Sequence, residues 1–183
     1  ITYRSNREGL GEGFEDSSVR HSIAADVALA DHYEVTIGEL ELAVLRQARI
    51  HDPNALALLT SVPGIGKILA LTILYEIHDI ARFPSVRDFA SYSRLVKCER
   101  TSAGKSLGSG GNKIGNAYLK WAFSEAAVLF LRANPKGQQY LARLENKHGK
   151  GKTLTVIAHK LARAVYDMLQ RKTAFNMEKF LQA

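Results

Sequence analysis

A chain of 183 residues, 46% of them apolar, can form one domain with its own core plus an accessory element, and it is too apolar to be disordered throughout. Its single cysteine excludes an internal disulfide or a paired-cysteine metal site. No apolar run approaches the ~18 residues of a membrane span and no signal peptide is visible, so we expect an intracellular protein without a membrane partner.

The charge is unevenly placed along the chain. Residues 1–50 carry five Arg and nine Asp or Glu, a net charge of −4, whereas residues 51–183 carry twenty basic and nine acidic side chains, a net charge of +11. This asymmetry indicates a polyanionic partner for the larger part. A solvated basic surface without a partner is the alternative.

The first 52 residues predict a linker and a helical arm. Residues 1–16 combine glycines with charged side chains, which is typical of a linker. One apolar stripe with spacings of three and four predicts a helix over 17–52. A narrow stripe of this length favours a coiled-coil-like arm, and an amphipathic helix packed on its own domain stays open. The stripe comprises Val19, Ile23, Val27, Ala30, Tyr33, Ile37, Leu40 and Val44.

Residues 55–77 match a helix-hairpin-helix pattern within a helical domain that we expect over 53–183. Gly64 and Gly66 allow a tight turn and a close approach to another backbone. The amides of Gly64, Ile65 and Gly66 would then lie at a helix N-terminus beside Lys67, where a phosphate is favoured. A tight helical hairpin without a ligand is the alternative.

Capping signals divide the rest of the chain into helices. Ser85 and Asp88 resemble a capping box, and Asn116 suits the N-cap of a helix over 117–133. That helix is apolar nearly all round, so we expect it at the centre of the core. Asn134-Pro135 begins another helix, and no strand pattern of useful length is present. We therefore predict an all-α fold.

The last helices predict a basic face and a buried face. The basic stretch, offset only by Glu145, is either a backbone-contacting surface or a solvated helix face. Its cations are Lys136, Arg143, Lys147, Lys150 and Lys152. A helix over 153–171 is expected to bury Leu154, Ile157, Leu161, Val165, Met168 and Leu169.

The segment over 97–120 combines hydroxyls, glycines and cations, and it is predicted as a long loop. Loops of this length in compact domains are usually functional or disordered. Ser102 is the candidate nucleophile, because Arg100 and Lys105 would stabilise charge on a phosphoryl group. Ser106 and Ser109 remain alternatives, as does a flexible loop without catalysis.

No metal site is expected in this chain. The six histidines are scattered, and no pair of Asp or Glu sits on an apparent strand as a two-metal nuclease site would need. His159 lies close to Lys160 and Arg163 in the sequence. This proximity is the only indication of a phosphate contact at His159.

Four motifs in a fixed order carry a family resemblance. They are Pro63-Gly64-Ile65-Gly66, Arg82-Phe83-Pro84-Ser85 with Phe89-Ala90-Ser91-Tyr92, Ser102-Ala103-Gly104-Lys105, and residues 112–120. In this order the chain resembles the C-terminal transposase part of the Piv/MooV-type DEDD insertion-sequence transposases over roughly residues 54–183. The arm resembles the coiled coil that precedes that part.

The resemblance implies a DNA recombinase with a composite active site. A RuvC-like N-terminal domain, which we do not find in this sequence, would supply four acidic residues and the divalent metal, expected to be Mg²⁺. The C-terminal part would supply a serine, here Ser102, that becomes covalently joined to DNA. The resemblance also implies that such enzymes work as multimers and are guided by a structured RNA. DNA, a structured guide RNA and further copies of the chain are therefore the expected partners.

We therefore expect the catalytic-serine and DNA-binding portion of a transposase, acting in the bacterial or archaeal cytoplasm at the nucleoid. The chain begins at Ile1, so we expect a fragment or a processed product that is inactive alone and forms a dimer or tetramer through the arm. The alternative is a non-catalytic helix-hairpin-helix DNA-binding or multimerisation module. The expected nucleic-acid contacts are Gly64, Ile65, Gly66, Lys67, Arg100, Lys105, Lys113, Lys120, Lys150 and Lys152.

Overall fold

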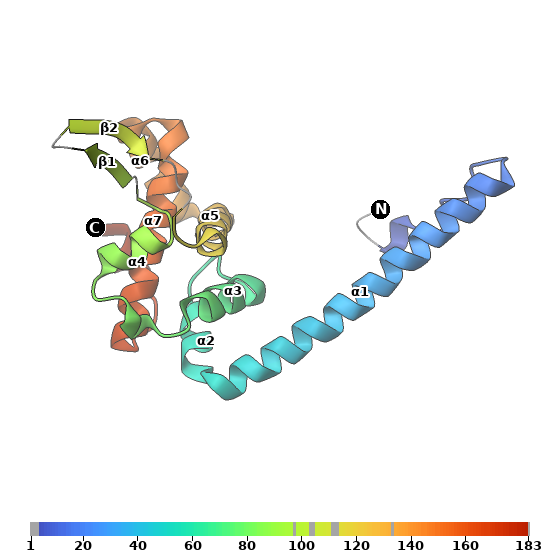
Figure 1. The fold of residues 1–183 in the computed structure, drawn as a ribbon, viewed down its shortest axis with the longest axis horizontal. Coiled ribbons are helices and arrows are strands. Elements are labelled where there is room, and N and C mark those ends of the chain that lie inside the picture. Colours follow the sequence, from blue (N-terminus) through green and yellow to red (C-terminus); the bar gives the residue numbers. More distant parts are fainter. Residues whose placement is uncertain (1–3, 97, 103–104, 111–113, 133, 183) are drawn as a thin grey trace. The chain divides into compact units, whose positions relative to one another are not determined.

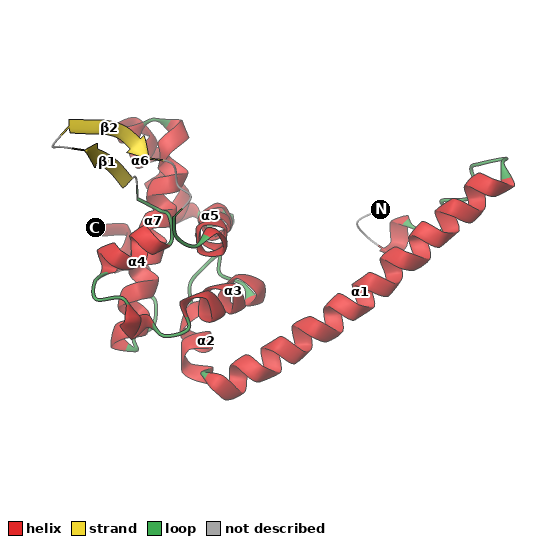
Figure 2. Cartoon of the chain, viewed as in Figure 1, coloured by secondary structure: helices red, strands yellow, loops and turns green. Residues whose placement is uncertain are grey.

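The computed structural model describes residues 4–96, 98–102, 105–110, 114–132 and 134–182, and it confirms the all-α class. Eight α-helices and one two-stranded hairpin make up most of these residues (Figure 2). The chain divides into two compact units, residues 1–47 and 48–183, which we describe separately. The helices are α1 (Ser17–His51), α2 (Pro53–Thr60), α3 (Lys67–Ile77), α4 (Val86–Tyr92), α5 (Ala117–Leu131), α6 (Pro135–His148), α7 (Lys150–Arg171) and α8 (Met177–Gln182).

The first unit is built on α1. The segment before it contains a short 3₁₀ helix, Arg4–Asn6, and the Arg7 guanidinium contacts Asp31 and Glu34 of α1. These contacts hold the described part of the expected linker against the helix. The second half of the apolar stripe is exposed to solvent. Its side chains are 41–60% exposed, and they are Tyr33, Ile37, Leu40 and Val44.

The second unit begins with two short helices joined by a turn. Asp52 caps α2 by accepting a hydrogen bond from the Ala55 amide, and Pro53 occupies the first turn, where its missing N–H costs nothing. Residues 61–66 then reverse the chain into α3 (Figure 1). Two helices joined by a short turn are therefore present where the sequence predicts them.

The core of this unit is formed around α5 and α7. Leu119, Phe123 and Phe130 of α5 are fully buried, as are Leu161 and Val165 of α7. Alanines between these side chains let helix backbones approach one another closely. Those fully buried or nearly so are Ala122, Ala126, Ala127, Ala158 and Ala162.

Aromatic side chains attach α4 to this core. Phe89 packs edge-on against Phe83 and Phe123, with ring centroids 5.2 and 6.0 Å apart respectively. Tyr166 of α7 lies 5.9 Å from Phe89 and donates a hydrogen bond to the Phe83 carbonyl. Offset and edge-on aromatic pairs add about 0.5–1.5 kcal/mol each beyond their burial, so α4 is held firmly although it is short.

Two expected core faces differ from the observed ones. The helix α5 is central, but Tyr118, Trp121 and Val128 are 46–66% exposed, so it is not buried all round. In α7, Leu154 is 43% exposed while the neighbouring Thr153 is fully buried. The inward face of α7 runs through residue 153 because the Thr153 hydroxyl donates to the Gly149 carbonyl, which satisfies the buried polar group.

Candidate functional site

The segment expected to be a loop is a β-hairpin in the part that the structure describes. Strands β1 (Cys98–Ser102) and β2 (Lys105–Gly110) pair in antiparallel fashion (Figure 1). The Cα register sets Ser102 opposite Lys105, Ser106 opposite Thr101, and Ser109 opposite Glu99. The prediction of an unstructured loop is thus wrong for these residues, because paired strands satisfy the backbone groups that a loop would leave to water.

This register distinguishes the three candidate serines by position. Ser102 ends β1 and its Cα is paired with that of Lys105, the first residue of β2, whose side chain is exposed. Ser106 and Ser109 lie further along β2 toward the hairpin stem. Arg100 lies where the register shifts between Glu99 and Thr101, and Lys113 lies outside the described residues.

Two hydrogen bonds hold the two ends of the hairpin segment together. The Asn116 amide donates to the Tyr92 carbonyl over 2.6 Å, and the Arg94 Nε donates to the Gly115 carbonyl over 2.9 Å. Gly115 has a φ of +104°, and a Cβ at this position would lie 2.6 Å from the Tyr92 carbonyl oxygen. Only glycine fits here, so the stem of the hairpin is fixed to the end of α4.

A polar cluster lies beside this stem. The Asn116 side chain caps α5 by accepting from the Leu119 amide, and it also donates to a Glu76 carboxylate oxygen of α3. Hydrogen bonding to Asn116, and then to Arg82, lowers the pKa of Tyr92 below its usual value. The Arg82 guanidinium lies 4.8 Å from the centre of the Tyr92 ring. These contacts join α3, α4 and α5 at the base of the hairpin.

The turn between α2 and α3 forms a second group of expected site residues. The Ile65 side chain is buried, and its amide donates to the Val62 carbonyl within the turn. Gly66 is the N-cap of α3 and has no side-chain cap, and Lys67 beside it is exposed. An uncapped helix start with a neighbouring lysine favours an anion.

Gly64 is fixed by packing within the chain. Its φ is +89°, and a Cβ would lie 2.5 Å from the Phe130 nitrogen and 2.7 Å from the Ala126 carbonyl oxygen. The close backbone approach expected from this glycine is therefore made to α5. Gly66, by contrast, has open space around its Cα.

The two groups lie at different ends of α5. The hairpin stem joins α5 at Asn116, and the α2–α3 turn packs near Ala126 and Phe130. At 1.5 Å per residue, this separates them by about 15–20 Å along the helix. Of the other expected contacts, Lys120 and Lys152 are exposed, and Lys150 is the first residue of α7.

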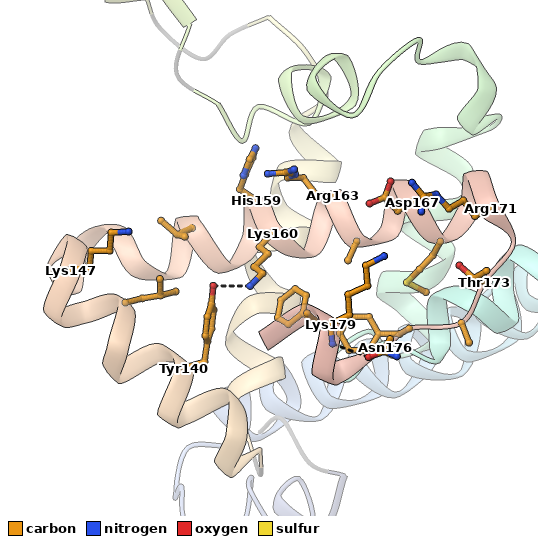
Figure 3. A pocket seen from close by; sticks show the side chains of 17 residues that line it. Tyr140, Lys147, His159, Lys160, Arg163, Asp167, Arg171, Thr173, Asn176 and Lys179 are labelled. Atoms are coloured by element: carbon orange, nitrogen blue, oxygen red, sulfur yellow. Dashed lines mark hydrogen bonds between the residues drawn. The ribbon is translucent and has the colours of Figure 1, made fainter. Parts of the chain in front are cut away.

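Sequence reasoning missed a groove whose walls are formed by α6, α7 and the segment containing α8 (Figure 3). The cavity, of about 670 Å³, is lined by five Lys or Arg side chains, one histidine and one carboxylate. We call it the basic groove. Its Lys, Arg, His and Asp side chains are Lys147, His159, Lys160, Arg163, Asp167, Arg171 and Lys179. The adjacency of His159, Lys160 and Arg163 was the only signal in the sequence.

The described residues provide no group of three or more His, Cys, Asp or Glu that could hold a metal ion. They also contain no helix with the length and apolar character needed to cross a lipid bilayer. The described residues therefore do not fit a metal centre for Mg²⁺.

Comparison with known proteins adds a family match. Residues 56–142 match the family model described as Transposase IS116/IS110/IS902 family. The chain is 32% identical over 125 residues to an uncharacterized 43.6 kDa protein of insertion element IS110 from Streptomyces coelicolor, covering 68% of this chain and 29% of that protein. It is 28% identical over 155 residues to the transposase for insertion sequence element IS1328 of Yersinia enterocolitica, covering 81% of this chain and 46% of that protein. The chain thus spans less than half the length of these relatives.

Proposed function

Because residues 56–142 are a transposase domain of the IS116/IS110/IS902 family, we propose that the chain is the DNA-binding and DNA-joining portion of an insertion-sequence transposase. Its relatives include a transposase for insertion sequence element IS1328, and the larger part of the chain has a net charge of +11. In this proposal the hairpin supplies the reacting group, and the α2–α3 turn binds the DNA backbone.

The proposed reaction is transesterification at Ser102. The Ser102 Oγ attacks a DNA phosphorus, an Oγ–P bond forms, and the P–O bond to the leaving deoxyribose breaks. The hydroxyl proton is transferred to a base, and the leaving oxygen takes up a proton. Attack by a second DNA hydroxyl on the same phosphorus would release Ser102 and join the new strand. The number of phosphodiester bonds is conserved, so no external energy source is needed.

The observation that carries this proposal is the register of the hairpin. Ser102 is paired with Lys105, and directly opposed residues in antiparallel strands have Cβ atoms about 4.5–5.5 Å apart. A lysine at that separation can stabilise charge on the phosphoryl oxygens. The stem contacts of Arg94, Gly115 and Asn116 support it further, because they hold the hairpin on the end of α5.

DNA binding is proposed for the start of α3 and for further basic residues of the second unit. The uncapped amides of α3 and the Lys67 side chain would hold one backbone phosphate. A second contact at the hairpin, whose stem joins α5 about 15–20 Å away along that helix, would fix the strand in direction. Arg100, Lys105, Lys113, Lys120, Lys150 and Lys152 are the further phosphate contacts of the proposal.

Other parts of the reaction lie outside this chain in the proposal. The family resemblance implies a RuvC-like domain with Mg²⁺, a structured guide RNA and a multimer. We include them as the setting in which Ser102 would act.

The test is a search for a covalent protein–DNA adduct on denaturing gels. A full-length transposase that carries this chain would be incubated with Mg²⁺, its RNA and a labelled target duplex. Ser102→Ala should abolish the adduct while binding survives, whereas Ser106→Ala and Ser109→Ala, as matched controls, should retain it. An adduct that persists in Ser102→Ala would refute the assignment. Cleavage without an adduct would instead identify water as the nucleophile.

A second function is favoured by the uncovered apolar stripe of α1. Tyr33, Ile37, Leu40 and Val44 share one helix face and are exposed, as expected for a multimerisation helix. In this alternative, Ser102→Ala would leave both DNA binding and recombination intact, and Leu40→Lys would convert a multimer into a monomer in light-scattering measurements. Unchanged mass in Leu40→Lys would contradict a role of this face in assembly.

A further inference from the structure

The basic groove has a cation on each of its three walls. Lys147 comes from α6, Arg163 and Arg171 come from α7, and Lys179 comes from α8. All four side chains are exposed, so their charges face solvent at the edge of the cavity (Figure 3). The groove therefore attracts an anion from several sides at once.

These charges are not neutralised within the described part of the chain. Asp167 lies one helical turn from both Arg163 and Arg171, yet among the described residues neither arginine forms an ion pair with it. Lys160 is held differently, because its ammonium donates to the Tyr140 hydroxyl over 2.8 Å and lies 4.3 Å from the Tyr140 ring centre. Lys160 thus provides a positive charge in a fixed position inside the groove.

The floor of the groove is aromatic. The Phe175 and Phe180 ring centroids lie 5.3 Å apart, and Tyr140 lies 6.4 Å from Phe180. Phe180 is buried against the core, whereas Phe175 is half-buried and lines the cavity. A flat ring inside the groove can accept another flat group by stacking.

An aromatic floor with a cationic rim fits an unpaired nucleic-acid strand better than a duplex. A duplex presents its phosphates but keeps its bases stacked inside, so it would reach the rim and leave the floor empty. An unpaired strand can place phosphates on the rim and a base on the floor at the same time. The cavity of about 670 Å³ also lies within the usual range of small-ligand pockets, which suits one extruded nucleotide.

We propose that the basic groove binds unpaired nucleotides of a DNA strand, with phosphates on Arg163 and Lys179 and a base stacked on Phe175. This site is separate from Ser102 and from the start of α3. It rests on the proposed function only for the identity of its ligand, because the strand break made by attack of Ser102 frees a strand end that can unpair.

The test compares two labelled probes on the full 183-residue chain, a short oligothymidylate strand and a duplex of the same length. Fluorescence anisotropy across a series of salt concentrations gives the affinity for each probe. Arg163→Ala combined with Lys179→Ala should reduce the salt slope of single-strand binding by about 1.4, since each phosphate contact contributes about 0.7. The matched control combines Arg87→Ala with Arg132→Ala, which removes two exposed charges outside the groove.

A second variant tests the aromatic floor without changing charge. Phe175→Leu keeps an apolar side chain but removes the ring, so single-strand affinity should fall about 5-fold or more while duplex affinity stays unchanged. Circular dichroism and a urea titration would verify that the variant is folded.

Three results would overturn the proposal. They are equal losses in the groove variant and the Arg87/Arg132 control, equal losses for strand and duplex, and displacement of the strand by a polyglutamate peptide as effective as unlabelled oligothymidylate. Tighter binding of the matching RNA strand would also reject DNA as the ligand. Failure of the proposed function would look different, because Ser102→Ala and Lys67→Ala would then have no effect while the groove variants still lost the single strand.

Discussion

Replacing Gly64 with alanine should destabilise the second unit strongly, for two separable reasons. The residue has a φ of +89°, where an L-residue costs about 1–2 kcal/mol. In addition, the new Cβ would lie 2.5 Å from the Phe130 nitrogen and 2.7 Å from the Ala126 oxygen. Both atoms belong to the backbone of a buried helix, so relief requires the turn and α5 to move apart, at a cost typical of overpacking of about 1–3 kcal/mol.

The two contributions sum to roughly 2–5 kcal/mol, a large share of the 5–15 kcal/mol that stabilises an ordinary domain. The matched control is Gly66→Ser two residues later. Gly66 has a φ of −80° and open space around it, and serine is a preferred N-cap, so this change should be neutral or slightly stabilising.

A urea titration followed by the fluorescence of Trp121 suits this comparison. Trp121 is the single tryptophan of the chain and lies on α5, the helix against which Gly64 packs. A loss below about 1 kcal/mol for Gly64→Ala, or equal losses for the two variants, would refute the packing argument. The result also affects DNA-binding experiments, because a binding defect in Gly64→Ala would reflect unfolding, whereas a defect in Lys67→Ala would reflect a phosphate contact.

Three further changes test local features of the second unit. Ser85→Ala removes the N-cap of α4 and should lower the unfolding free energy by about 1 kcal/mol in urea titrations. Asn116→Asp keeps the cap of α5 but sets a carboxylate against Glu76, so it should cost about 1–3 kcal/mol at neutral pH, and no loss would exclude the Glu76 contact. Burial, and then the charge of Arg163, lower the pKa of His159, so the unfolded chain binds a proton more readily than the folded one. Thermal stability should therefore fall as the pH drops below the ordinary histidine value of about 6.5, and His159→Gln should flatten this part of the profile.

The sequence predicts the features that depend on near neighbours in the chain. Ser85, Asn116 and Asn134 each cap the helix that follows, because the acceptor and the amide it binds lie three residues apart in the chain. The apolar stripe of α1 is likewise readable from spacing alone, whereas its exposure to solvent is seen only in the structure. These rules need no knowledge of the tertiary fold, which is why they can be applied directly to a sequence.

Features that depend on distant segments could not be predicted in this way. The hairpin strands Cys98–Ser102 and Lys105–Gly110 have no alternation of apolar and polar residues, so nothing in their composition indicates a sheet. The inward face of α7 differs from the prediction at its first turn, where Thr153 is buried in place of Leu154 because its hydroxyl is satisfied locally. The basic groove needs side chains from Tyr140 to Phe180, and only the fold brings them to one cavity.

The two proposed DNA contacts are both attached to α5, one near each end of the helix. The hairpin stem is fixed at Asn116 and the α2–α3 turn is fixed at Ala126 and Phe130, so the spacing between the base of the hairpin and the phosphate anchor is set by one helix of the core. A buried helix is far stiffer than a loop, since close packing leaves its side chains no room to relax. Changes in the core of α5, such as Phe123→Leu, should therefore impair joining more than binding, although Phe123 is fully buried and cannot contact DNA. Such a separation of joining from binding would identify the helix as the element that aligns the two sites.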